Sequence, residues 1–142
     1  MAKSQDKGKR FERAIAKQFS QAFDIDVRRT PNSGGLDIKG DLRNLHGILE
    51  NFVIECKCQE KMNIWKCLEQ TMNQAGSKTG LLVFSRNYES NYACLYLDDF
   101  INLLLRINKA LTDLRAISDE SDFESVLTTV KDLIEELDIS KA

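Results

Sequence analysis

The chain contains segments in which apolar residues recur every three or four positions and short apolar runs bounded by turn residues. The first pattern predicts an amphipathic helix over residues 9–23. It also predicts a second helix, which begins after Asn63 and ends before Gly76, because asparagine caps helix N-termini and glycine accommodates the C-terminal turn. The apolar stripe of this second helix is Ile64, Leu68, Met72 and Ala75.

Short β-prone runs predict strands between these helices and after them. The predicted strands are residues 26–30, 36–42, 48–58, 81–84 and 92–97. The sequence Pro31-Asn32-Ser33-Gly34-Gly35 predicts a loop between the first two, and residues 44–47 predict a turn. The alternation of helices and strands predicts the α/β fold class.

Two further helical patterns close the sequence. Asp98 and Asp99 can cap a helix that is apolar on one side through residues 100–114. Ser121 and Glu124 form a capping box, and it opens a helix with an apolar stripe over residues 123–137. We expect this stripe to pack against the preceding helix, with a dimer surface as the alternative.

A length of 142 residues predicts one domain with a real core. The polar start and the lack of an apolar run near about 18 residues predict a cytoplasmic protein with no secretory or membrane segment. In that compartment, the four cysteines are expected to be reduced. The Cys56-x-Cys58 spacing is too short for a usual zinc pair, so buried core thiols are the favoured interpretation.

The net charge of −2 conceals an uneven distribution of charge. Residues 1–43 hold ten lysines and arginines against six acidic residues, whereas residues 44–142 hold ten against sixteen. The basic part can meet nucleic-acid phosphates, which supply most non-specific affinity. The alternative is a solvated helix face with a frayed basic tail.

Candidate chemistry is concentrated in the apolar strand that contains Glu55 and Lys57. Side chains alternate along a strand, so these two point to one face and Cys56 points to the other. A carboxylate and an ammonium at the end of an apolar strand are costly unless they pair or bind something. Asp41, beyond a glycine-rich segment, can supply a second carboxylate. Two carboxylates and a lysine are consistent with a Mg²⁺ site for phosphodiester hydrolysis.

Each candidate residue also has a purely structural interpretation. Glu12 can form an i,i+4 pair with a neighbouring lysine, and Glu55 with Lys57 can be a solvated cross-strand pair. His46 is the only histidine and lies in a predicted turn. Nucleases that use paired histidines, or a histidine base, therefore fit this sequence poorly.

The ordered motifs of residues 7–100 resemble the PD-(D/E)XK nuclease superfamily, and within it the small Holliday-junction-resolvase-like branch of archaea and phages. The residues that carry the resemblance are Gly8, Glu12, Arg29, Ser33, Gly34, Gly40-Asp41, Glu55-Cys56-Lys57, and Gln70 or Gln74. The chain departs from the pattern at Gly40, where the superfamily's name gives proline.

The resemblance implies a restriction-endonuclease-like core, with a central mixed β-sheet flanked by helices, over residues 1–100. Residues 101–142 would then be a C-terminal helical extension of the same domain. The implied ligands of Mg²⁺, or of Mn²⁺ in its place, are Asp41, Glu55, the main-chain carbonyl of Cys56, and Glu12. Asp37 remains an alternative to Asp41.

The other implied roles concern catalysis and DNA. Lys57 would orient the attacking water and neutralise charge on the phosphate. Gln70, favoured over Gln74, would orient water or a phosphate oxygen. The implied DNA-binding residues are Lys9, Arg10, Arg29, Asn32 and Ser33.

The function expected from these features is that of a Mg²⁺-dependent DNA endonuclease. Branched DNA, such as a four-way junction, is the expected substrate. A homodimer is the expected assembly, because resolving a junction needs two symmetric cuts. The alternatives are a restriction-type or repair-type nuclease that acts on duplex DNA, and a non-catalytic nucleic-acid-binding protein on the nuclease fold.

Overall fold

The computed structural model describes residues 2–31, 39–117 and 124–132. The chain divides into two compact units, Met1–Tyr96 and Leu97–Ala142. The first unit contains all the strands and every candidate catalytic residue that the structure describes. The boundary of the nuclease core at residue 100 and its union with the extension in one domain stay predictions.

In the described residues of the first unit there are two α-helices, one short 3-10 helix and five strands. The helices are α1 (Ala2–Phe23), η1 (Gly47–Asn51) and α2 (Ile64–Ala75). The strands are β1 (Arg28–Arg29), β2 (Leu42–Arg43), β3 (Phe52–Cys58), β4 (Thr79–Ser85) and β5 (Tyr92–Cys94).

The strands form two small sheets. β1 and β2 pair antiparallel, with Arg28 opposite Arg43. β3 runs parallel to β4, and β5 is antiparallel to β4, so the larger sheet has the order β3-β4-β5. The chain crosses from β3 to the parallel strand β4 through α2, since parallel neighbours require such a connection.

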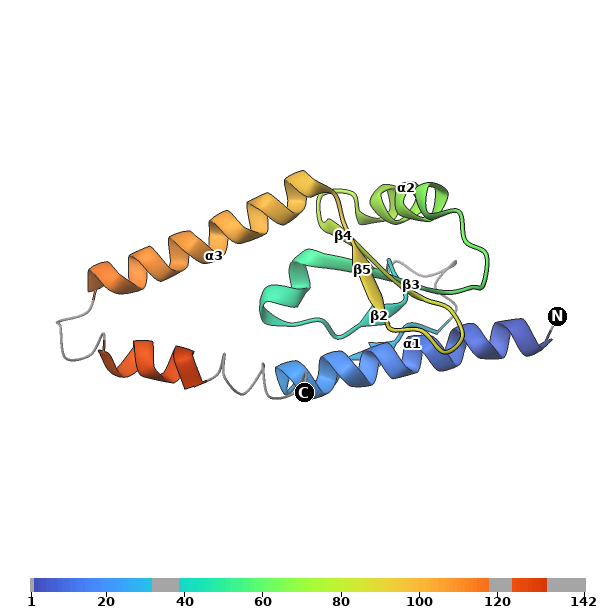
Figure 1. Ribbon diagram of the computed structural model, residues 1–142, viewed down its shortest axis with the longest axis horizontal. Coiled ribbons are helices and arrows are strands. Elements are labelled where there is room, and N and C mark those ends of the chain that lie inside the picture. The colour runs from blue at the N-terminus through green and yellow to red at the C-terminus, as the bar shows by residue number, and fades with distance from the viewer. Residues whose placement is uncertain (1, 32–38, 118–123, 133–142) are drawn as a thin grey trace. The chain divides into compact units, whose positions relative to one another are not determined.

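α1 and α2 lie on opposite sides of the larger sheet (Figure 1). Ile54, Cys56 and Val83 point towards α1, where they form one hydrophobic core with Ile15 and Ala16. On the other side, α2 packs so closely on β4 that a Cβ at Gly80 would lie 2.7 Å from the sulfur of Met72. The side chains of β3 therefore divide between two environments.

Both predicted helices of this unit are confirmed, with one boundary moved. The side chain of Asn63 caps α2 by accepting a hydrogen bond from the Lys66 amide at 3.1 Å, and Gly76 ends the helix at φ +60°. α1 begins at Ala2 instead of residue 9, because its basic first two turns continue the helix without an apolar stripe.

Several predicted strand boundaries were wrong. Within the strand predicted over residues 36–42, the described residues 39–41 lie outside any strand and only Leu42 belongs to one. The reason is that Gly40 adopts φ +84° and leaves the extended region. Ile48–Asn51 belong to η1 instead of β3, which begins at Phe52. β5 ends at Cys94, since Leu97 already begins the next helix. Of the loop predicted at residues 31–35, only Pro31 lies within the described residues.

The second unit contains α3 (Leu97–Ile117) and a further helix over residues 124–132. α3 begins at Leu97, so Asp98 and Asp99 lie in its first turn and do not precede it as the predicted caps. Ser121 of the predicted capping box lies outside the described residues. The packing of the last helix against α3 stays a prediction. Within the parts of the chain that are described, no helix is both long and apolar enough to cross a membrane.

Candidate functional site

β3 carries two of the candidate catalytic side chains on one face. Glu55 is almost completely buried, and Lys57 is half-buried. The ammonium of Lys57 donates a hydrogen bond to Glu55 Oε1 at 2.7 Å. Cys56 points to the opposite face and lies in the core. The predicted alternation along this strand is therefore confirmed, and the alternative of a solvated surface pair is wrong because Glu55 is buried.

Asp41 is attached to β3 through its main chain and its side chain. Its backbone amide donates to the Ile54 carbonyl at 2.8 Å, and its carboxylate Oδ2 accepts a hydrogen bond from the Cys56 amide at 2.8 Å. Its carbonyl accepts the Thr30 amide at 2.7 Å. These contacts place the buried Asp41 carboxylate beside the strand segment that carries Glu55.

The residue before Asp41 shows why the chain has Gly-Asp at this point. Gly40 has φ +84°, a conformation that L side chains rarely adopt. A Cβ there would lie 2.9 Å from the Ile54 carbonyl oxygen and 3.0 Å from Val53 Cγ1. Only glycine therefore allows the segment to approach β3 closely enough for the Asp41 contacts.

The charges of this cluster are strongly coupled. Burial raises the pKa of Glu55, and the charge of Asp41 raises it further, while the hydrogen bond from Lys57 opposes the shift. Burial by itself lowers the pKa of Lys57, but the hydrogen bond to Glu55 and the charges of Glu55 and Asp41 outweigh it and raise the pKa. Lys57 therefore stays an ammonium at neutral pH, whereas burial and the charge of Asp41 disfavour the ionised form of Glu55.

Glu12 reaches this region from α1. It is half-buried and forms an ion pair with Arg29 Nε at 2.5 Å. Its charge is one cause of the raised pKa of Glu55, so the two carboxylates influence each other. The alternative that Glu12 pairs with a neighbouring lysine of the same helix, such as Lys9 or Lys17, is wrong, because its ion-pair partner is Arg29 on β1.

The donor chemistry of this cluster suits a hard divalent cation. Asp41 and Glu55 offer carboxylate oxygens, the type of ligand that Mg²⁺ and Mn²⁺ favour. Burial and then the charge of Asp41 raise the pKa of Glu55, and the hydrogen bond from Lys57 opposes this only in part. Among the residues that the structure describes, however, no three His, Cys, Asp or Glu side chains are close enough together to form a metal site. The cluster thus fits a cation in charge and in ligand type.

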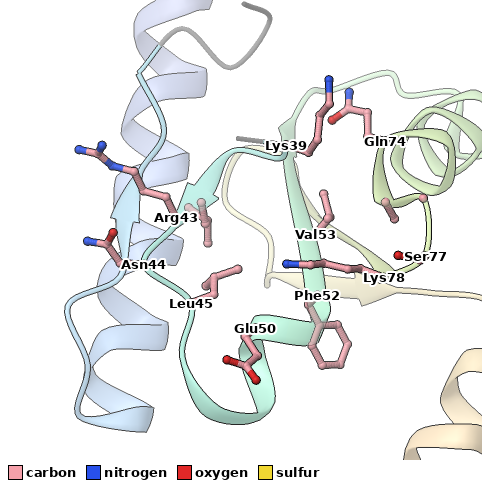
Figure 2. A pocket seen from close by; sticks show the side chains of 13 residues that line it. Lys39, Arg43, Asn44, Leu45, Glu50, Phe52, Val53, Gln74, Ser77 and Lys78 are labelled. Carbon is pink, nitrogen blue, oxygen red and sulfur yellow. The ribbon is translucent and has the colours of Figure 1, made fainter. Parts of the chain in front are cut away.

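The two candidate glutamines of α2 lie beside Lys39. Gln70 and Gln74 line a shallow hollow together with Lys39 and Lys66. Gln74 also lines a larger hollow of about 590 Å³ next to the first half of β3. Figure 2 shows the ends of Lys39 and Gln74 next to each other and Lys78 extending across this larger hollow. The preference for Gln70 over Gln74 stays a prediction.

The predicted DNA-binding residues are only partly within the described chain. Lys9 and Arg10 lie on α1, half-buried and exposed respectively, and Arg29 is paired with Glu12. Asn32 and Ser33 lie outside the described residues, and so does Asp37, the alternative to Asp41. Sequence analysis gave no role to Lys39 and Lys78, which the structure brings to one hollow. Their only sequence signal was their glycine-rich surroundings.

The cysteines form no disulfide. Cys56 is a core thiol, and burial raises its pKa, so it is not a reactive thiolate. Cys58, Cys67 and Cys94 are only partly buried, which corrects the expectation that all four would be core residues.

The family described as "Phage putative PDDEXK endonuclease" matches residues 3–141. No curated protein and no solved structure gives a significant match to this chain. The family implies a restriction-endonuclease-like fold and phosphodiester hydrolysis, and nucleases of its superfamily generally use divalent metal ions. The match covers nearly the whole chain, so the protein belongs to this phage family of PD-(D/E)XK endonucleases.

Proposed function

We propose that this endonuclease is Mg²⁺-dependent and cuts branched DNA as a homodimer. The observation that carries the catalytic part is the cluster of Asp41, Glu55 and Lys57, which β3 and its hydrogen bonds hold together. Two buried carboxylates beside one lysine are costly as a purely structural element, because burial and the charge of Asp41 both disfavour ionised Glu55. The same arrangement is useful for hydrolysis of a phosphodiester.

The residues of the cluster have different roles in the proposed hydrolysis. Asp41 and Glu55, with the Cys56 carbonyl and Glu12 as further candidates, would hold the cation. When bound, Mg²⁺ or Mn²⁺ polarises the phosphoryl group and favours deprotonation of a water molecule. Lys57 orients that water and stabilises the charge that grows on the phosphate. The water oxygen bonds to phosphorus, one ester P–O bond breaks, and the leaving oxygen takes up a proton.

Contacts with the DNA backbone come from two groups of cations. One group is predicted on and beside α1, at Lys9, Arg10 and Arg29. The second group is Lys39 and Lys78, whose hollow lies next to Val53 on the same β3 face as Glu55. The Lys39→Ala and Lys78→Ala variants should each weaken binding to every DNA and reduce its salt dependence.

The experiment that tests the function compares labelled four-way junction, plain duplex and single strand. Each DNA is incubated with Mg²⁺, with Mn²⁺ and with chelator. Wild type is compared with Lys57→Ala, and Lys61→Ala serves as the matched control because Lys61 is an exposed lysine after the same strand. We expect paired nicks in the junction that need metal, disappear in Lys57→Ala and persist in Lys61→Ala.

The other outcomes distinguish the alternatives. Metal-dependent cleavage of plain duplex alone would retain the active site and reject branched DNA as the substrate. Unchanged cleavage by Lys57→Ala would reject the active-site assignment. Binding without cleavage under every condition would favour a non-catalytic DNA-binding protein. Sedimentation of the protein with and without junction tests the homodimer.

A further inference from the structure

The carboxyl ends of β3 and β4 border a hollow that takes no part in the proposed hydrolysis. It has a volume of about 390 Å³ and lies between the segment after β3 and the loop between β4 and β5. Its apolar wall is formed by Met62, Ile64, Phe84 and Tyr92, and the last two stack with ring centroids 5.6 Å apart. A hollow of this size is in the range that binds small organic groups.

Two highly exposed aromatic residues are neighbours in the chain of residues that line this hollow. Trp65, next to Ile64, is 79% exposed, and Tyr88, between Arg86 and Glu89 of the lining, is fully exposed. A single exposed aromatic residue is ordinary on a protein surface. Here two of them belong to the two segments that line one hollow, α2 and the loop between β4 and β5.

The backbone of Tyr88 is a second and independent sign of function. Its φ of +61° is in the left-handed region, which glycine and asparagine occupy easily and bulky side chains rarely do. Strain of this kind persists at binding and catalytic sites, where the side chain has a task. Glycine would adopt this backbone conformation without strain, yet the position holds a tyrosine whose side chain buries little area.

The charged residues around the hollow are paired with one another. Arg86 bonds Glu89 at 3.1 Å, and Lys7 bonds Glu60 at 3.1 Å. Glu60 also accepts the amide of Asn87 at 3.0 Å, and this ties the loop to the segment after β3. An electrically balanced hollow with aromatic walls favours an uncharged planar group over a phosphate.

The hollow is close in the chain to the catalytic lysine. Gln59, which lines it, is two residues after Lys57, and its amide bonds the Ser85 carbonyl at 3.1 Å. DNA with its backbone at Lys57 would therefore bring nearby nucleotides to the hollow. A base in an intact duplex is stacked and paired, and only an unpaired base is free to leave the helix.

We propose that this hollow binds an unpaired nucleobase of the DNA substrate, stacked on Tyr88 and Trp65. The proposal rests on the proposed function, since it concerns the same DNA, and it names the structural class of DNA that the enzyme selects. DNA that offers unpaired bases, at a branch point or a bulge, binds in preference to continuous duplex.

The test measures binding in chelator, so that it does not depend on cleavage. The probes are a duplex with a single-nucleotide bulge, the matching blunt duplex and a short oligothymidine. Trp65 is the only tryptophan of the chain, so its fluorescence reports directly on stacking. We expect the bulged duplex and the oligothymidine to quench it, and the blunt duplex to leave it nearly unchanged.

Two variants separate binding from folding. Tyr88→Gly relieves the backbone strain, so its melting temperature should equal or exceed that of wild type. Its affinity for the bulged duplex should fall at least about fivefold, as expected for the loss of one aromatic stacking contact. Tyr96→Ala, at another exposed tyrosine, is the matched control and should bind as wild type does.

Three results would overturn the proposal. They are equal quenching by bulged and blunt duplex, unchanged affinity of Tyr88→Gly for the bulge, and a lower melting temperature of Tyr88→Gly, which would make Tyr88 a structural residue. Cleavage activity without any preference for the bulge would reject this inference and leave the nuclease function intact. Bulge-dependent quenching without cleavage would support this inference and reject the nuclease function.

Discussion

The backbone amide of Cys56 donates a hydrogen bond to the Asp41 carboxylate, with 2.8 Å between N and Oδ2. The Asp41 amide in turn donates to the Ile54 carbonyl at 2.8 Å. Asp41 is thus positioned by the strand that carries Glu55 and Lys57. Hydrogen bonds to β3 therefore connect the three candidate catalytic residues, and precise chemistry needs such support.

This relationship predicts different results for two substitutions of Asp41. Asp41→Asn keeps an oxygen that can accept the Cys56 amide, so its stability should stay close to that of wild type. Asp41→Ala leaves that buried amide without its acceptor and should cost about 1–3 kcal/mol of unfolding free energy. Both should lose nearly all cleavage. Denaturant unfolding beside a nicking assay checks this, and equal stability of the two variants would contradict the structural role.

Gly40→Ala should destabilise the protein strongly. The new Cβ would lie 2.9 Å from the Ile54 carbonyl oxygen, at φ +84°. Gly47→Ala is the matched control, because Gly47 has φ +62° and nothing within 4 Å of the new Cβ. We expect a loss of about 1 kcal/mol for the control, from backbone conformation alone, and about 2–4 kcal/mol for Gly40→Ala. Thermal unfolding measures both, and similar losses would show that the contact with β3 is loose.

The ion pair of Glu12 and Arg29 should contribute more than the neighbouring pair of Asp26 and Arg28. Both pairs are short, at 2.5 and 2.7 Å, but the first is mostly buried and the second is exposed. A double-mutant cycle with Glu12→Gln and Arg29→Met should give a coupling of about 1–3 kcal/mol. The same cycle at the exposed pair should give a clearly smaller coupling, because solvent screens that pair. If the two couplings are equal, burial does not strengthen the first pair.

Glu55→Gln should stabilise the metal-free protein at neutral pH while it abolishes cleavage. The folded state raises the pKa of Glu55 through burial and the charge of Asp41. The folded protein therefore favours protonated Glu55, and stability falls as the pH rises through the raised pKa. Unfolding in chelator between acidic and neutral pH should show this loss in wild type and a smaller loss in Glu55→Gln. If Glu55→Gln were less stable than wild type at neutral pH, burial beside Asp41 would not destabilise ionised Glu55.

The sequence predicted the parts of the site that depend on local pattern. Alternation along an apolar strand was enough to put Glu55 and Lys57 on one face and Cys56 on the other. Asn63 and Gly76 were enough to bound α2, because caps act through neighbouring residues. The Gly-Asp pair indicated Asp41, although only the structure showed the contact with Ile54 that requires the glycine.

Features that depend on long-range contacts could not be predicted in this way. The partner of Glu12 is Arg29, seventeen positions away, and no periodicity of α1 indicates it. The hollow of Lys39 and Lys78 arises because α2 ends beside the first half of β3. The strand predicted before Leu42 failed because the close approach at Gly40 overrides the β-propensity of its neighbours.

The two faces of β3 also predict how the strand would respond if every residue were replaced in turn. At positions 54 and 56, which are in the core against α1, substitutions should reduce the amount of soluble protein. At positions 55 and 57, polar replacements should leave the protein plentiful but inactive. In a library scored for both abundance and activity, the kind of loss would then alternate with a period of two residues along the strand. Loss of abundance would identify residues of the core face, and loss of activity alone would identify residues of the face that carries Glu55 and Lys57.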